Sequence, residues 1–179
     1  MPRTDLSRGP HADPTAGACL MERVSAIAGE PFSDRPSCTH PALAALAQQV
    51  NDRVSDAARD RLLALAPALA DAADDDPRAA WRLVAVCAEH ALALAPGDHL
   101  ATRLRARAAR ADRRWTRVRL DGLAGRAAGL RALPHLTAAF HRLAVLSGPS
   151  GSAQRDEVLV AMLTDAVSPA PAAVELAAA

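Results

Sequence analysis

The sequence predicts an all-α protein, an irregular bundle of six to eight helices. Half of the residues are hydrophobic, mostly Ala, Leu and Val, and only 2% are aromatic. This composition suits closely packed helices better than a β-sandwich. Apolar side chains recur at helical spacing along most of the chain. Turns rich in Pro, Gly and Asp separate these stretches, and no stretch shows the alternation typical of a strand.

We expect one helical domain over residues 17–166, between two less ordered ends. The length of 179 residues suits a single domain. The polar segment 1–16 contains three prolines and is expected to be a disordered arm. Residues 167–179 are expected to be a flexible tail rich in Ala and Pro. No apolar segment has the length of a signal peptide or a membrane span, so we expect a cytoplasmic protein.

The expected helices follow from the apolar positions and from residues that start or end helices. Gly29 is suited to end the first helix, and two prolines keep residues 30–40 in a loop. Pro41 is suited to the first position of the second helix, and the acids at 74–76 favour a helix start. The expected spans are 18–28, 41–52, 55–73 with an interruption at Pro67, 77–95, 98–114, 134–146 and 153–166.

The basic residues are all arginine, and they are unevenly distributed. Residues 1–100 carry fewer arginines than acids, whereas residues 101–179 carry twelve arginines against six acids. Five arginines recur at spacings of three and four, so they share one helix face. They are Arg103, Arg107, Arg110, Arg114 and Arg117. Leu100, Leu104 and Trp115 lie on the neighbouring face and are expected in the core.

This arginine face is a candidate interaction surface with two interpretations. It could follow a phosphate backbone, although the stripe has no interleaved aromatic side chain and no helix-turn-helix or zinc-finger spacing. It could instead be solvated or paired with acidic surfaces of the same chain, which is the favoured interpretation. Those acidic surfaces contain Asp52, Asp56, Asp60 and Asp74–Asp76.

A second candidate site combines two thiols with an imidazole, at Cys19, Cys38 and His40. Such residues bind Zn²⁺, which takes four ligands. The candidates for the fourth ligand are Glu22, Asp34 and His11. The chain has no C-x-x-C pair, and the favoured interpretation is that Cys19 and Cys38 are small buried hydrophobic residues. A disulfide between them would need an oxidising compartment.

The loop before the second helix is the other candidate surface. Glu30, Asp34 and Arg35 lie in a segment that prolines stiffen, and rigid polar loops are common recognition sites. The same residues can instead act as caps and salt bridges that stabilise the fold, and we favour this structural role.

Several short motifs lie between residues 17 and 70. They are Cys19-Leu20-Met21-Glu22, Ala28-Gly29-Glu30-Pro31-Phe32-Ser33-Asp34-Arg35-Pro36, Cys38, Pro41, Val50-Asn51-Asp52 and Leu65-Ala66-Pro67. In order and spacing they resemble a family of uncharacterised proteins from actinobacteria and their phages. The resemblance implies a helical N-terminal module followed by a variable, Ala-rich portion. It implies no activity, cofactor or substrate.

No motif in the chain indicates catalysis. The sequence has no G-x-S-x-G nucleophile motif and no Gly-rich phosphate loop, and its six histidines are scattered. We therefore expect a non-enzymatic protein without a cofactor or a small-molecule substrate. Its expected partner is another protein, with nucleic acid as the alternative and no role for a membrane.

Overall fold

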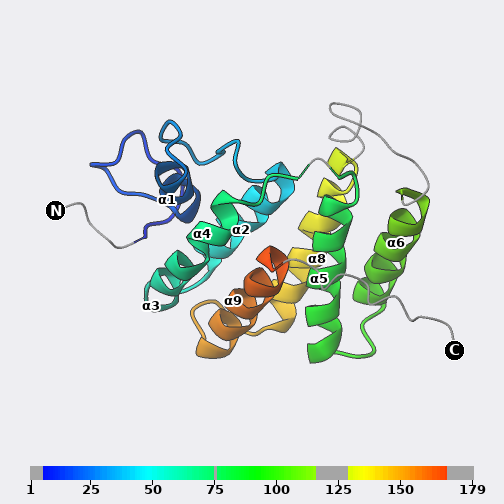
Figure 1. The fold of residues 1–179 in the computed structure, drawn as a ribbon. Coiled ribbons are helices and arrows are strands. Elements are labelled where there is room, and N and C mark those ends of the chain that lie inside the picture. Colours follow the sequence, from blue (N-terminus) through cyan, green and yellow to red (C-terminus); the bar gives the residue numbers. More distant parts are fainter. Residues whose placement is uncertain (1–5, 75, 116–128, 169–179) are drawn as a thin grey trace, which may run out of the picture.

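The computed structural model describes residues 6–74, 76–115 and 129–168, and it confirms the predicted all-α fold (Figure 1). Within these ranges there is no strand, only an isolated bridge between Thr39 and Ala72. No helix of this part is both long and apolar enough to cross a membrane. The elements are α1 (Leu20–Ile27), α2 (Pro41–Arg53), α3 (Asp56–Arg59), a 3₁₀ helix (Asp60–Leu65), α4 (Ala66–Ala70), α5 (Ala79–Leu94), α6 (His99–Trp115), α8 (Leu133–Leu146) and α9 (Ala153–Val167).

Helix α5 is the centre of the C-terminal part of the molecule. It packs against α6, α8 and α9, while α1 packs against α2 and α4. Helix α2 contacts α5, α8 and α9 and so connects the two groups. Figure 1 shows the result, with α1 at one end of the molecule and α6 at the other.

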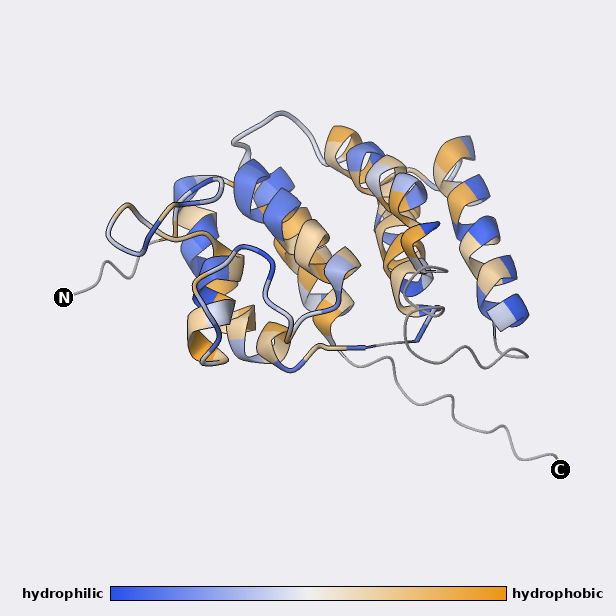
Figure 2. Ribbon diagram, turned by 90° about the horizontal axis from the view of Figure 1, so that it is seen from above, coloured by the Kyte–Doolittle hydropathy of each residue, from blue (hydrophilic) through white to orange (hydrophobic). Residues whose placement is uncertain are grey.

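The buried hydrophobic side chains form one cluster that extends through both groups of helices. In Figure 2 the hydrophobic faces of the helices lie mostly between neighbouring helices. The cluster includes Leu20, Leu46, Leu62, Trp81, Leu104, Phe140 and Met162. The expectation for Leu100 is wrong, because this side chain is 43% exposed. The buried stripe of α6 follows Ala101, Leu104 and Ala108, and Leu100 falls outside it.

Residues 6–16, part of the expected disordered arm, make defined tertiary contacts instead. The Leu6 side chain is only 6% exposed and belongs to the core. Asn51 Nδ2 donates a 2.9 Å hydrogen bond to the Ser7 carbonyl oxygen, and the Gly9 amide donates one of 2.9 Å to Asp52 Oδ1. The segment is thus held by the burial of Leu6 and by hydrogen bonds with side chains of α2. The composition of the segment alone could not indicate these contacts. Residues 1–5, and 169–179 of the expected tail, lie outside the described residues.

Two buried polar groups hold neighbouring helices together. Asp156, in the first turn of α9, accepts hydrogen bonds from the Ser55 amide at 3.0 Å and from Ser55 Oγ at 2.5 Å. The buried Arg59 guanidinium donates to the carbonyl oxygens of Asn51 and Val54, at the end of α2. A cation at this position satisfies free carbonyls and opposes the negative end of the helix dipole.

The acidic segment before α5 predicts how stability depends on pH. Burial alone would raise the pKa of Asp76, but hydrogen bonds from Arg78 and Arg82 outweigh it and lower the pKa to about 2. Because the pKa of an unfolded Asp is about 4, ionised Asp76 stabilises the fold above that pH, and the contribution is lost as pH falls toward 2. In urea unfolding, wild type should therefore have a larger free energy of unfolding than Asp76→Asn at pH 6. This difference should become smaller between pH 4 and pH 2. A difference independent of pH would contradict this assignment.

Candidate anion-binding cleft

Four arginines of the predicted stripe lie exposed along one face of α6. They are Arg103, Arg107, Arg110 and Arg114. Leu104 and Ala108, which alternate with them at helical spacing, are buried in the core. Arg117, the fifth member of the stripe, lies outside the described residues. The helical period therefore separates a charged face from an apolar one along α6.

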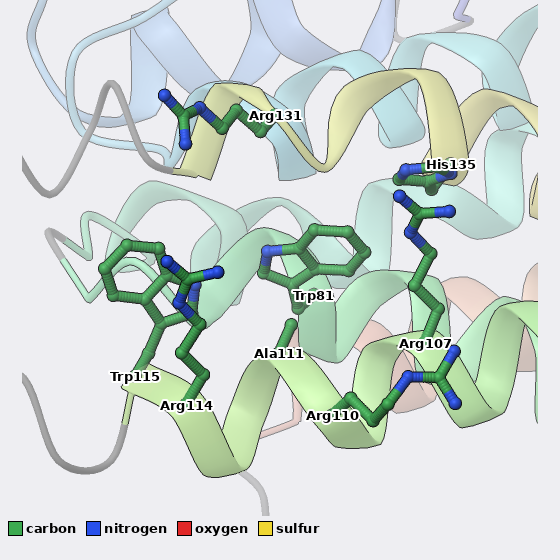
Figure 3. A pocket seen from close by; sticks show the side chains of 8 residues that line it. All are labelled: Trp81, Arg107, Arg110, Ala111, Arg114, Trp115, Arg131 and His135. Carbon is green, nitrogen blue, oxygen red and sulfur yellow. The ribbon is translucent and has the colours of Figure 1, made fainter.

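Part of this charged face forms one wall of a cleft with a volume of about 480 Å³ (Figure 3). Helix α6 provides three arginines, α5 provides a tryptophan, and the chain at the start of α8 provides a further arginine and a histidine. Figure 3 shows Arg107 reaching from α6 toward His135 on α8. The residues that line the cleft are Trp81, Arg107, Arg110, Ala111, Arg114, Trp115, Arg131 and His135.

Aromatic rings lie among these guanidinium groups. Trp81 and His135 stack with their ring centroids 5.3 Å apart and their planes inclined by 28°. The Arg114 guanidinium carbon lies 5.6 Å from the centroid of the Trp115 ring. Trp81 is buried, whereas Trp115 and His135 are partly exposed. The arginine stripe itself has no interleaved aromatic residue, but tertiary packing brings Trp81 and His135 beside it, and Trp115 lies next to Arg114 on α6.

The cleft carries positive charge that the described part of the chain does not neutralise. Below, its four lining arginines, Arg107, Arg110, Arg114 and Arg131, are called the cleft arginines. Among the described residues, no acidic side chain lines the cleft, and none of the cleft arginines pairs with an acid. His135 responds to this environment: burial lowers its pKa, and the charge of Arg107 lowers it further.

The acids that could have covered the arginine face have other partners. Asp74 and Asp76 pair with Arg82, at 2.6 Å and 2.9 Å. Asp56 pairs with Arg59 at 2.8 Å, and Asp60 Oδ1 accepts a hydrogen bond from the Leu6 amide. Among the described residues, the arginine face is therefore exposed to solvent, one of the two arrangements that the favoured interpretation allows, and is not paired with these acidic surfaces. Asp75 lies outside the described residues.

The residues of the Glu30 loop mostly hold the loop itself together. Glu30 accepts hydrogen bonds of 2.7 Å from both the amide and the hydroxyl of Ser37. Gln48 Nε2 donates to the carbonyl oxygen of Asp34 at 2.6 Å and to its carboxylate at 3.1 Å. Arg35 has an exposed side chain, and its amide donates to Ser33 Oγ. Glu30, Asp34 and Arg35 thus have structural contacts and do not meet the cleft lining.

The candidate metal residues Cys19, Cys38 and His40 are not brought together. Among the described residues, no group of three His, Cys, Asp or Glu side chains is placed to hold a metal ion. Cys19 is buried at the start of α1, Cys38 is partly exposed, and His40 Nδ1 accepts a hydrogen bond from the Ala42 amide as the cap of α2. All three cysteines of the chain are free thiols.

The thiols should differ strongly in reactivity. Burial raises the pKa of both Cys19 and Cys87 to about 12, which suppresses their thiolate forms. We expect iodoacetamide at pH 8 to alkylate Cys38 first in the folded protein and all three cysteines in urea. Peptide mapping of the carbamidomethyl groups measures this order. Early modification of Cys87 in folded protein would contradict the packing described above.

The chemistry available to the cleft is recognition of an anion. Guanidinium groups donate bidentate hydrogen bonds to phosphate and carboxylate groups, and their planes stack on aromatic rings. Sequence reasoning found Arg107, Arg110 and Arg114 from their spacing but missed Trp81, Arg131 and His135, which no local pattern connects to them. No protein-family model, no curated protein and no solved structure matches this chain, so the cleft is interpreted from its own residues.

Proposed function

We propose that the protein binds single-stranded nucleic acid through this cleft, with the cleft arginines on phosphates and the Trp115 ring beside a base. One observation carries the proposal: four arginines and three aromatic rings line one cleft, and none of the described acids is among its lining residues. Proteins that bind single strands without sequence preference combine positive grooves with stacking aromatic rings. The cytoplasmic location expected from the sequence is part of the same proposal.

The charge distribution supports an anionic partner. Like charges in a confined space repel one another, and a bound polyanion removes this repulsion. The cleft volume of about 480 Å³ lies in the range of sites that enclose a small ligand or one unit of a polymer.

The rings favour nucleic acid over an acidic protein segment. An acidic peptide can pair its carboxylates with the guanidinium groups, but it has no bases that would stack on the aromatic rings. Each stacked base contributes about 1–3 kcal/mol to single-strand binding. Trp115 should therefore stabilise a complex with nucleic acid by stacking, but not a complex with poly-glutamate. The leading expectation from the sequence, another protein as partner, becomes the competing outcome of the test.

The test is a titration of the protein with a labelled oligothymidylate, followed by fluorescence anisotropy at several salt concentrations. If four arginines contact phosphates, the slope of log Kobs against log salt should be about −3, a loss of about 50-fold between 50 and 200 mM. Both tryptophans of the chain line the cleft, so intrinsic fluorescence should change on binding. Absence of binding at low salt, or equally tight binding of poly-glutamate, would overturn the proposal.

A further inference from the structure

A second constellation lies at the other end of the molecule, in the segment before α1 and in α1 itself. Ser7 Oγ lies 2.9 Å from His11 Nε2, and His11 Nδ1 lies 2.8 Å from Glu22 Oε2. A hydroxyl, an imidazole and a carboxylate are thus connected in series through both ring nitrogens. This order is the one in which a nucleophile, a general base and an orienting acid act in serine hydrolases.

The local fold holds these three side chains firmly. Glu22 is 1% exposed and sits in the first turn of α1, where it also accepts hydrogen bonds from the amides of His11 at 2.6 Å and Cys19 at 2.7 Å. Asn51 binds the Ser7 carbonyl oxygen, as described above. The imidazole of His11 is largely buried, while Ser7 is partly exposed. The base and the carboxylate are therefore fixed, and the hydroxyl is the exposed end of the series.

Gly17 leaves the space that the serine and histidine occupy. Its φ is +136°, and a Cβ at this position would lie 2.8 Å from Ser7 Oγ and 2.9 Å from His11 Nε2. Both contacts are closer than real Cβ atoms make. A side chain at residue 17 would therefore have to displace the serine–histidine pair.

The charge state of Glu22 sets the tautomer of His11. Burial alone would raise the pKa of Glu22, but the hydrogen bonds from the His11 and Cys19 amides and from the His11 ring outweigh it and lower the pKa. An ionised carboxylate only accepts hydrogen bonds, so His11 Nδ1 carries a proton. In the neutral ring, Nε2 then presents its lone pair to the hydroxyl of Ser7. Ser7 Oγ also lies 3.2 Å from the Ala18 carbonyl oxygen, a second acceptor for its proton.

We propose that Ser7, His11 and Glu22 form a hydrolytic triad that acts on carboxylic esters. The Ser7 oxygen attacks the ester carbonyl carbon, His11 Nε2 takes the hydroxyl proton, and the ester C–O bond breaks as the leaving alcohol receives that proton. Water then attacks the acyl-serine, giving its proton to His11. The acid departs, and the proton returns to Ser7 Oγ. This activity was not expected from the sequence, and it is independent of the cleft.

The test uses a fluorophosphonate probe, which forms a Ser–O–P bond and expels fluoride. Folded wild-type protein should be labelled at Ser7, as located by peptide mapping, and protein in urea should not. Ser37 is the internal control, because its hydroxyl donates to the Glu30 carboxylate rather than to a histidine. His11→Gln removes the base and should slow labelling by about 10²–10⁴-fold. Ser7 left unlabelled in folded wild type would overturn the proposal.

Substitution of two glycines provides a matched test in which Ser7, His11 and Glu22 are not themselves substituted. Gly17→Ala should abolish labelling by displacing Ser7 and His11. Gly9→Ala introduces the same side chain at another positive φ, +73°, where a Cβ meets nothing within 4 Å, and should keep the labelling. Circular dichroism establishes that each variant is folded. Equal labelling of the folded Gly17→Ala and Gly9→Ala proteins would also overturn the triad.

Discussion

Replacing Arg107, Arg110 and Arg114 together by Glu is expected to abolish the binding of oligothymidylate. The change removes three of the four cleft arginines and places three carboxylates in the same cleft, so attraction to phosphate becomes repulsion. Loss of three phosphate contacts alone should lower the magnitude of the salt slope by about 2. The combined effect should exceed about 100-fold in affinity at 50 mM salt, as measured by fluorescence anisotropy.

The same helix offers a matched control for this variant. Arg103, Arg105 and Arg113 are also exposed on α6 but do not line the cleft. Replacing these three by Glu changes the net charge of the protein and of α6 by the same amount. We expect this control to weaken binding much less than the cleft variant, because the removed charges lie farther from the bound strand. Equal losses in the two variants would mean that α6 attracts the polymer diffusely, without using the cleft.

Phe140→Ala is expected to have the largest effect on stability. Phe140 is fully buried on α8, and the Arg53 guanidinium carbon, at the end of α2, lies 5.0 Å from its ring centroid. Truncation leaves a cavity where α2 meets α8, and the expected loss in free energy of unfolding is about 3–5 kcal/mol. Urea unfolding followed by circular dichroism measures the loss. Val145→Ala, which truncates a side chain of α8 that is 55% exposed, should change stability by less than about 0.5 kcal/mol.

The same experiment tests whether residues 17–166 behave as one domain. The hydrophobic cluster is continuous, and the Asp156 contacts with Ser55 tie α9 to the N-terminal helices. We therefore expect Phe140→Ala to shift a single transition, with circular dichroism and tryptophan fluorescence giving the same midpoint. Two separate transitions, of which only the fluorescence-detected one moves, would divide the chain into two units.

The positions of most helices could be predicted from the sequence because their determinants are local. Pro41 starts α2 as expected, and the spans expected over 153–166 and 134–146 differ from α9 and α8 by single residues at their ends. The least regular stretch, 55–73, was expected to be interrupted at Pro67. It instead forms α3, a 3₁₀ helix and α4, with Pro67 in the first turn of α4. A proline fits the first turn of a helix without loss of a hydrogen bond. The α-helix is therefore interrupted before Pro67, by the 3₁₀ helix, and not at Pro67 itself.

By itself, then, the sequence determined the helical class, the approximate helix boundaries and the arginine face of α6, since all three depend on residues within a few positions of one another. Tertiary structure alone decided which side chains meet. It brought Trp81, Arg131 and His135 to the arginines, and it kept Cys19, Cys38 and His40 apart. It also placed Ser7 and His11, in a segment expected to be disordered, against the carboxylate of Glu22. Contacts of this kind depend on how the helices pack, and the packing is determined by the whole buried surface rather than by any local pattern.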